Sequence, residues 1–152
     1  MKKLLVFAAI LSLILAAVSC SNLNADKMVV AFVDHESSID VLIGENLFTT
    51  FVYGESLMDN VVTKPILFPV KTPAGIKVNR SFPFAHVEGE QPDHPHHTGI
   101  FFTYDEVNGS GFWNNTQFPP HITDVEILEK MGGETGTLKV KMIWKNENAE
   151  PL

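Results

Sequence analysis

Short stretches in which apolar and polar residues alternate recur from residue 28 to the end of the chain. The clearest stretch spans 138–144, where every second residue is apolar. Successive side chains of a β-strand point to opposite faces of its sheet, so a period of two predicts a strand with one buried face. The apolar residues at 125–128 and the glycine-rich turn at 132–136 come directly before this stretch. Together they predict a hairpin.

Two more hairpins are predicted nearer to the N-terminus, each from a pair of apolar stretches around a turn. They join 39–43 to 47–53 across Gly44-Glu45-Asn46, and 66–70 to 76–78 across Thr72-Pro73-Ala74-Gly75. Proline early in a turn and glycine late in it suit the backbone angles that tight turns require. No stretch of the mature chain has a long apolar stripe of helical period. We therefore expect an all-β fold, an antiparallel β-sandwich over residues 28–152.

The last eight residues, 145–152, form a turn-like stretch that follows the final predicted strand. An all-β domain whose last element is a hairpin leaves a sheet edge exposed or a layer missing. The pattern therefore predicts a β-sandwich that is truncated at its C-terminus.

Residues 1–19 have the features of a secretory signal peptide. Two lysines precede an apolar run at 4–18, which is too short for a transmembrane helix that stays in the mature protein. Residues 17–20 resemble a bacterial lipoprotein signal, which predicts lipidation of Cys20 and a lipid-anchored tether at 20–27. Ser21, rather than an aspartate, follows the cysteine and favours the outer membrane. We expect a cell-envelope protein that is anchored in the outer membrane and faces the periplasm.

Charge and cysteine content exclude two classes of protein. Removing the signal peptide lowers the count of Lys and Arg from 11 to 9 against 18 acids, so the net charge changes from −7 to −9. Nucleic-acid binding needs clustered Lys and Arg, so we expect no nucleic-acid partner. Cys20 is the only cysteine, which excludes a disulfide framework.

Candidate chemistry is concentrated in the segment Asp-His-Pro-His-His at 93–97. Prolines at 92 and 95 favour extended backbone, in which alternate side chains share a face. His94 and His96 are therefore predicted to point one way, and Asp93 and His97 the other. The apolar run 100–104 that follows predicts a buried strand.

In a first interpretation, this segment lines a sugar pocket. Histidine can give or take a proton near neutral pH because its unperturbed pKa is about 6.5. Ring opening of an aldose needs such an acid/base pair, and an aromatic ring suits the apolar face of a sugar. The catalytic residues are then His94, His96 and His97, and the substrate contacts are Arg80, Asp93, Tyr104 and Trp113.

A second interpretation makes His94 and His96 metal ligands, because two imidazoles at i and i+2 of a strand can reach one ion. Zn, Fe or Mn would be the candidates, in a metal-dependent oxygenase or hydrolase. The next acids after the pair, Asp105 and Glu106, lie farther along than the carboxylate of a cupin H-x-H site. In a third interpretation the histidines cap a strand end in a non-catalytic structural lipoprotein.

Two basic residues outside this segment have less specific interpretations. Arg80 could pair with Glu88 or Glu90, or hold a substrate hydroxyl or carboxylate. Lys64 is interpreted as an ordinary surface lysine.

Three segments together resemble a family of bacterial secreted proteins that has carried the label "methane oxygenase PmoA". They are KPILFPVKTPAGIKVNRSFPF, DHPHHTGIFFTYDEVNG and FWNNT, within a matching region at 53–116. The resemblance implies a β-supersandwich similar to galactose mutarotases and other carbohydrate-active proteins. Members of the family are longer than this chain and often have Arg where this sequence has Thr98.

The resulting hypothesis is an envelope lipoprotein with a carbohydrate or other small molecule as its partner. Its function is carbohydrate-directed, and the sequence leaves open whether it is a sugar-active enzyme or a sugar-binding module. No particular cofactor is indicated.

Overall fold

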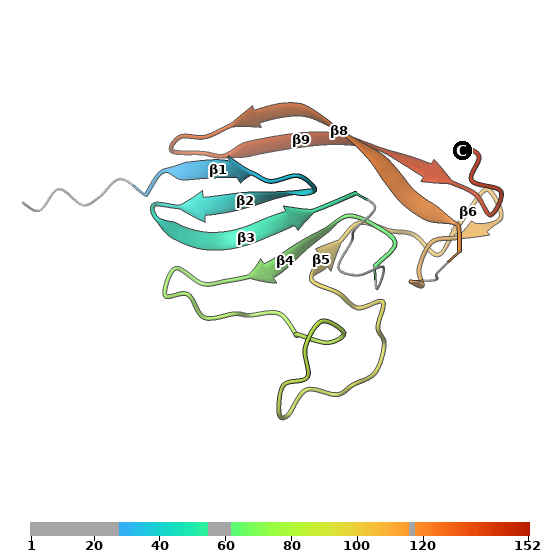
Figure 1. Cartoon of the computed structure of the whole chain (residues 1–152), viewed down its shortest axis with the longest axis horizontal. Helices are drawn as coiled ribbons and strands as arrows, with labels where there is room; N and C mark the ends of the chain where they lie inside the picture. The colour runs from blue at the N-terminus through green and yellow to red at the C-terminus, as the bar shows by residue number, and fades with distance from the viewer. Residues whose placement is uncertain (1–27, 55–61, 116–117) are drawn as a thin grey trace, which may run out of the picture.

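The computed structural model describes residues 28–54, 62–115 and 118–152 (Figure 1). These ranges contain nine β-strands and no helix, and all pairings between the strands are antiparallel. The strands are β1 Val30–Asp34, β2 Ser38–Ile43, β3 Asn46–Val52, β4 Ile66–Val70, β5 Ile100–Phe101, β6 Glu106–Val107, β7 Ser110–Gly111, β8 His121–Met131 and β9 Thr137–Lys145. The predicted all-β antiparallel fold is confirmed. The predicted signal peptide, Cys20 and the tether lie outside the described residues.

Five strands form the main sheet, in the order β1-β2-β3-β4-β5. The predicted hairpin of β2 and β3 is confirmed, with Ile43 opposite Asn46 and a turn at Gly44, whose φ is +62°. The hairpin of β8 and β9 is also confirmed, and it runs from the pair Met131 and Thr137 to the pair His121 and Lys145. Alternation along the sequence therefore located both hairpins.

The hairpin predicted between β4 and 76–78 forms only next to its turn. Lys71 pairs with Lys77 in an isolated bridge, and the Val78 amide donates to the Val70 carbonyl at 2.9 Å. The rest of β4 pairs with β3 on one side and with β5 on the other, where Ile66 is opposite Phe101. The Val70 amide donates instead to the Asn79 side-chain oxygen at 2.8 Å, so the pairing with the returning chain ends at Val78.

The prediction of a buried strand over 100–104 is wrong. Strand β5 ends at Phe101, and the side chains of Phe102 and Tyr104 are 70% and 67% exposed. The physical reason is position, since β5 lies at the edge of the sheet. Apolar residues at such an edge have neighbouring strands on one side only.

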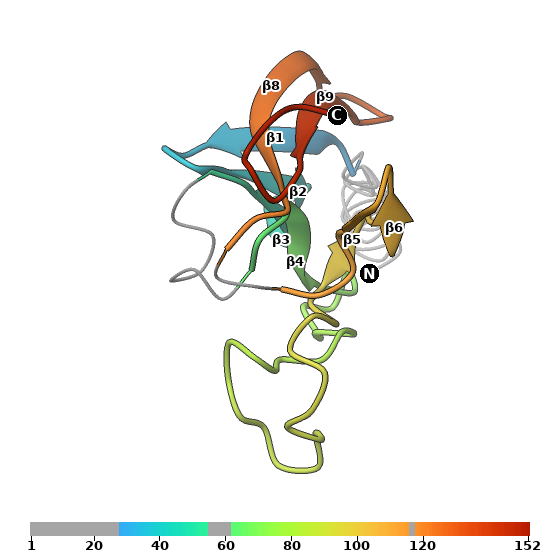
Figure 2. The same ribbon diagram turned by 90° about the vertical axis from the view of Figure 1, so that its right-hand side faces the viewer.

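The buried apolar core lies around β3 and β4. Val52, Val62 and Ile66 form its centre, with Phe84 and Phe101 packed against them. Phe84 comes from the long loop 71–99, which joins β4 to β5 and projects from the sheet on the side away from hairpin β8–β9 (Figure 2). The core therefore holds the middle of this loop, at Phe84, against the sheet.

Hairpin β8–β9 lies beside β1 (Figures 1 and 2). At the β1 end, Val30 and Gly133 exchange two backbone hydrogen bonds of 2.7 and 2.9 Å. At the other end, the Ile122 amide donates to the Thr63 carbonyl at 3.2 Å. The hairpin is thus attached to the rest of the fold near both of its ends.

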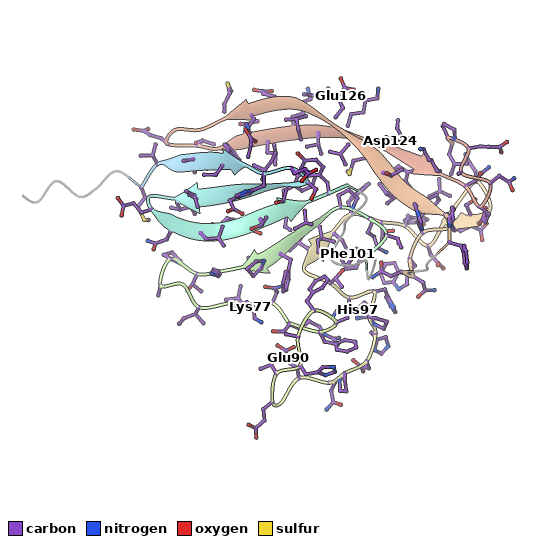
Figure 3. All side chains as sticks on the ribbon, viewed as in Figure 1. Lys77, Glu90, His97, Phe101, Asp124 and Glu126 are labelled. Carbon is purple, nitrogen blue, oxygen red and sulfur yellow. The ribbon has the colours of Figure 1, made fainter. Side chains whose placement is uncertain are left out.

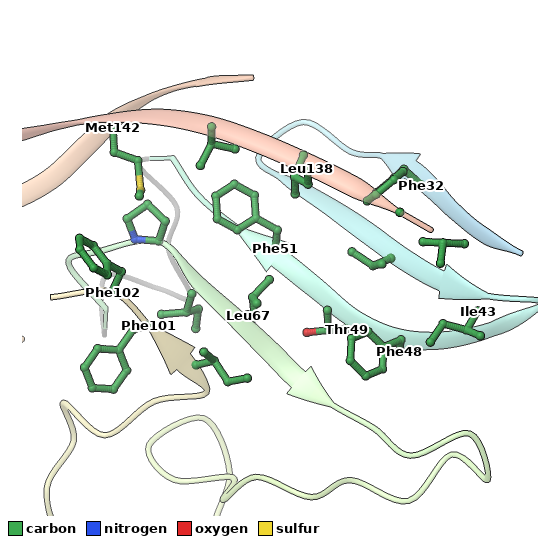
Figure 4. A pocket seen from close by; sticks show the side chains of 17 residues that line it. Phe32, Ile43, Phe48, Thr49, Phe51, Leu67, Phe101, Phe102, Leu138 and Met142 are labelled. Atoms are coloured by element: carbon green, nitrogen blue, oxygen red, sulfur yellow. The ribbon is translucent and has the colours of Figure 1, made fainter. Parts of the chain in front are cut away.

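An apolar trough of about 580 Å³ lies between the main sheet and β9 (Figure 4). Side chains from both walls line it, including Phe32, Phe51, Leu67, Phe102, Leu138 and Met142. Within the described ranges, no helix has the length and apolar character that crossing a membrane requires.

Candidate functional site

The loop 71–99 returns to the sheet at β5 and brings three histidine rings together. The rings of His94 and His97 are stacked, with centroids 4.9 Å apart and planes 7° apart. The ring of His96 meets the other two edge-on, with centroids 4.4 Å from His97 and 5.6 Å from His94. Figure 3 shows where His97 lies on the loop relative to Phe101 of β5.

The predicted extended backbone is wrong for this segment. His94 has φ of +47°, and the His97 amide donates to the His94 carbonyl at 2.9 Å, which closes a turn. Pro95 occupies the second position of this turn, where the fixed φ of proline is favourable. The same proline that suggested an extended strand therefore favours the turn. As a consequence, all three rings lie together instead of on two faces.

Trp113 completes the group, which we call the His/Trp cluster: His94, His96, His97 and Trp113. The Trp113 ring centroid lies 6.1 Å from that of His96 and 6.2 Å from that of His97. Its side chain is 39% exposed, so one part of the indole packs on the imidazoles and Phe101 while another part meets solvent. The cluster therefore presents a half-exposed aromatic surface with ring nitrogens around it.

Asp93 and Arg80 flank the cluster on the loop. A carboxylate oxygen of Asp93 lies 3.1 Å from Nδ1 of His94, and the other accepts from the Arg80 guanidinium at 3.3 Å. Arg80 also donates to the backbone carbonyls of Gln91 and Asp93. The predicted pairing of Arg80 with Glu88 or Glu90 is therefore replaced by a pairing with Asp93.

Glu90 has another role in the same loop. Its carboxylate accepts the backbone amides of Ser81 at 2.6 Å and Phe82 at 3.1 Å. Although partial desolvation opposes it, these two hydrogen bonds lower the pKa of Glu90. Glu90 and Arg80 thus tie the two halves of the loop to each other.

Lys64 is the functional candidate that the sequence interpretation missed. It was predicted to lie on the surface, but its side chain is only 1% exposed. Its Nζ donates to the carbonyls of Phe112 at 3.0 Å and Trp113 at 2.7 Å, and lies 5.2 Å from the centroid of the Phe101 ring. The apolar run that follows Lys64 was the available signal, because it places the lysine at the start of a core strand.

Asn115 was also missed, and it joins the histidine turn to the start of β4. Its side-chain amide donates to the Pro95 carbonyl at 3.0 Å, and its side-chain oxygen accepts from the Thr63 hydroxyl at 3.5 Å. Lys64 and Asn115 therefore hold the Trp113 segment and the histidine turn to one region of the fold.

Two basic groups of the site have lowered pKa values. Burial lowers the pKa of Lys64 to about 8. Burial, together with the positive charges of His97, His94, Lys64 and Arg80, lowers the pKa of His96 below its usual value. At neutral pH, His96 is therefore a neutral imidazole that has one donor and one acceptor nitrogen.

The pKa of Asp93 is also lowered. Partial desolvation acts against this change, but the hydrogen bond and charge of His94, followed by the charge of Arg80, outweigh it. Asp93 is therefore a carboxylate at neutral pH.

Not every predicted site residue joins the cluster. Tyr104 lines a different hollow, together with Phe102 and Trp144, and no member of the His/Trp cluster lines that hollow. Of the predicted set, the structure thus brings together His94, His96, His97, Trp113, Asp93 and Arg80. It places Tyr104 elsewhere.

Among the described residues, no group of three or more His, Cys, Asp or Glu side chains is arranged to hold a metal ion. In the geometry present, the imidazoles of His94 and His97 stack face to face. The metal-ligand role of His94 and His96 stays a prediction.

Comparison with known proteins gives one match. The model of the DUF6807 family, described as a family of unknown function, matches residues 38–152. No curated protein and no solved structure matches the chain. The matched region contains the whole His/Trp cluster together with Lys64, Arg80 and Asp93.

Proposed function

The chain belongs to the DUF6807 family, and we propose that its His/Trp cluster binds a carbohydrate, either in a sugar-active enzyme or in a sugar-binding module. The observation that carries the proposal is the half-exposed indole of Trp113, which lies against the imidazoles of His96 and His97. A sugar ring has apolar C–H faces and a rim of hydroxyls. An aromatic face with imidazole donors and acceptors beside it suits both features.

The proton affinities in the cluster also suit sugar chemistry. The lowered pKa of His96 leaves one ring nitrogen free to accept a proton at neutral pH. His94 lies beside the Asp93 carboxylate, with Nδ1 3.1 Å from a carboxylate oxygen. Two imidazoles side by side offer the donor and acceptor nitrogens that the opening of an aldose ring needs. We also propose a mutarotase-like supersandwich for this chain, and the all-β antiparallel fold supports this proposal.

We further propose that the protein is anchored to the outer membrane through a lipid on Cys20. The order of lysines, apolar run and cysteine in the sequence supports this. Metabolic labelling with an alkyne-tagged fatty acid tests it. We expect the label on the full chain and none on Cys20→Ser, and equal labelling of both would disprove the anchor.

Binding is tested by titrating the full chain with neutral and acidic monosaccharides while following tryptophan fluorescence. Sugars that bind at the cluster change the environment of Trp113, so the expected result is a saturable change in emission. We expect His96→Ala to abolish the change. The matched control is His35→Ala, because His35 is an exposed histidine that pairs with Asp40 at 3.0 Å. A titration without any saturable change for any sugar would contradict the proposal.

Turnover then separates the two forms of the proposal. Anomer interconversion of the bound sugar, followed by polarimetry or NMR, is expected of an enzyme and is lost in His96→Ala. A sugar-binding module has no turnover in either protein.

A further inference from the structure

The charges around the His/Trp cluster indicate which sugars it takes. Resting on the proposed function, we propose that the ligand is an acidic sugar, which carries a carboxylate or a sulfate group. The inference depends on three observations: a lysine without an acidic partner, a single carboxylate shared by two cationic groups, and the sign of the charges that act on His96.

Lys64 supplies a positive charge that no described acidic group neutralises. Its Nζ is bonded to two carbonyl oxygens and faces the Phe101 ring, and none of the ion pairs among the described residues includes it. With burial alone lowering its pKa to about 8, the amine is still mostly protonated at neutral pH. A buried charge without a counter-ion is expensive, so a nearby anion would be favoured.

The one carboxylate beside the cluster is already engaged. Asp93 contacts both the Arg80 guanidinium and the His94 ring, so its single negative charge is shared between two partners. A second acid of the loop, Glu90, uses its carboxylate on the amides of Ser81 and Phe82. The third, Glu88, forms no ion pair with Lys64, so none of the three acids of the loop neutralises this lysine.

The surroundings of His96 also show an excess of positive charge. Besides burial, the cationic side chains of Lys64 and Arg80 act on its ring, and both disfavour its protonation. Lys64 reaches the cluster through Trp113, whose backbone carbonyl it holds at 2.7 Å. The region around His96 is therefore positive, in a chain whose net charge is −7.

The negative net charge does not cancel this local field. At physiological ionic strength, charges in solvent are screened over about 8 Å, whereas partly buried groups are screened much less. The exposed acids elsewhere on the molecule therefore act weakly at the cluster. Lys64 is buried and the Arg80 side chain is 26% exposed, so their charges are screened less at the cluster.

The test compares ligands that share the galactose ring and differ in the charge and the chemical group at C6. Galacturonic acid, its methyl ester, galactose and galactose 6-sulfate are titrated into the full chain, with affinity measured by tryptophan fluorescence and calorimetry. We expect galacturonic acid or galactose 6-sulfate to bind about tenfold more tightly than the neutral ester and galactose, because charge-assisted hydrogen bonds are about twice as strong as neutral ones. The two acidic arms distinguish a carboxylate from a sulfate site.

Equal affinities for charged and neutral sugars would overturn the acidic-sugar inference and leave the proposed function intact. Failure of every sugar to bind would overturn both. The charge series uses the unaltered protein, so it gives an answer even if variants of the buried lysine fail to fold.

A variant pair then assigns the preference to Lys64. Lys64→Met is expected to bring the ratio of the affinities for galacturonic acid and galactose close to one, even where the loss of its hydrogen bonds to the Phe112 and Trp113 carbonyls weakens the binding of both sugars. Lys139→Met makes the same change in net charge at an exposed lysine of β9 and is expected to keep the preference. If Lys64→Met still prefers acidic over neutral sugars, the positive field that selects them does not come from Lys64, and its proposed role is overturned.

Discussion

Lys64 combines burial with a positive charge, and its hydrogen bonds go only to carbonyl groups. Burial disfavours the charged form in the folded chain, whereas the unfolded chain leaves the amine in water. The folded pKa of about 8 is therefore below the unfolded value of 10.5. Between these two values the unfolded chain binds more protons than the folded chain, so stability rises with pH.

We expect the free energy of unfolding contributed by Lys64 to rise by about 3 kcal/mol between pH 8 and 10.5, where the penalty of its buried charge disappears. Urea unfolding at pH 7, 8, 9 and 10.5 measures this rise. Lys64→Met removes the titrating group and serves as the control for all other lysines and tyrosines. Parallel pH profiles for the two proteins would contradict the prediction.

Thr98 gives a second prediction, because its hydroxyl is buried next to the histidine turn. The residue is 0% exposed, and its Oγ1 has no hydrogen-bond partner among the described residues. Valine has nearly the same shape and no polar atom. We expect Thr98→Val to stabilise the fold by about 1 kcal/mol, measured by urea unfolding. A loss of stability would show that the hydroxyl is paired in solution, for example by water.

Strand β5 depends on one glycine. Gly99 has φ of +56°, and a Cβ at this position would lie 2.3 Å from the Leu67 carbonyl oxygen of β4. The chain can therefore approach β4 only without a side chain. This close approach is what brings the histidine turn back to the sheet.

We expect Gly99→Ala to destabilise the fold by about 3 kcal/mol, since it combines an unfavourable φ with a clash against backbone. Thermal unfolding measures the loss. Gly75→Ala is the control, because Gly75 also has a positive φ, of +79°, but nothing lies within 4 Å of its Cβ position. Similar losses in both variants would show that the close approach to Leu67 does not matter.

The hairpins could be predicted because their strands alternate in polarity and their turns contain glycine. Strands β2, β3, β8 and β9 needed only this local information. The pairing of 76–78 with β4 ends instead at the Asn79 side chain, whose oxygen accepts the Val70 amide. The alternation of apolar and polar residues does not indicate such a side-chain hydrogen bond.

The candidate site was predicted in part for the same reason. His94, His96 and His97 stand out because they are adjacent in sequence, and Trp113 because it follows a turn close by. Lys64 lies about thirty residues before the histidines in the chain, and lysine is a residue type that is usually found on the surface. Its role depends on the carbonyls of Phe112 and Trp113, which only the folded chain brings to it.

The apolar trough between the main sheet and β9 gives a prediction for the molecule as a whole. Open apolar surface of this kind binds the dye ANS. We expect the folded chain to enhance ANS fluorescence, and Leu138→Lys, which places a charge in the trough, to reduce this enhancement severalfold. Leu128→Lys is the control, because Leu128 is an exposed leucine of β8 that does not line the trough. Equal dye binding by both variants would place the dye elsewhere.

The two attachments of hairpin β8–β9 have a kinetic consequence. Near one end lie the paired hydrogen bonds of Val30 and Gly133, and near the other lie the bond from Ile122 to Thr63 and the contact of Phe112 with Trp144. Between them, β9 faces the trough. We expect amide hydrogens in the middle of β9 to exchange with solvent through local opening that costs less than global unfolding, and those near the two attachments to exchange more slowly. The molecule would then have two rates of opening within one hairpin, which hydrogen-exchange mass spectrometry can resolve.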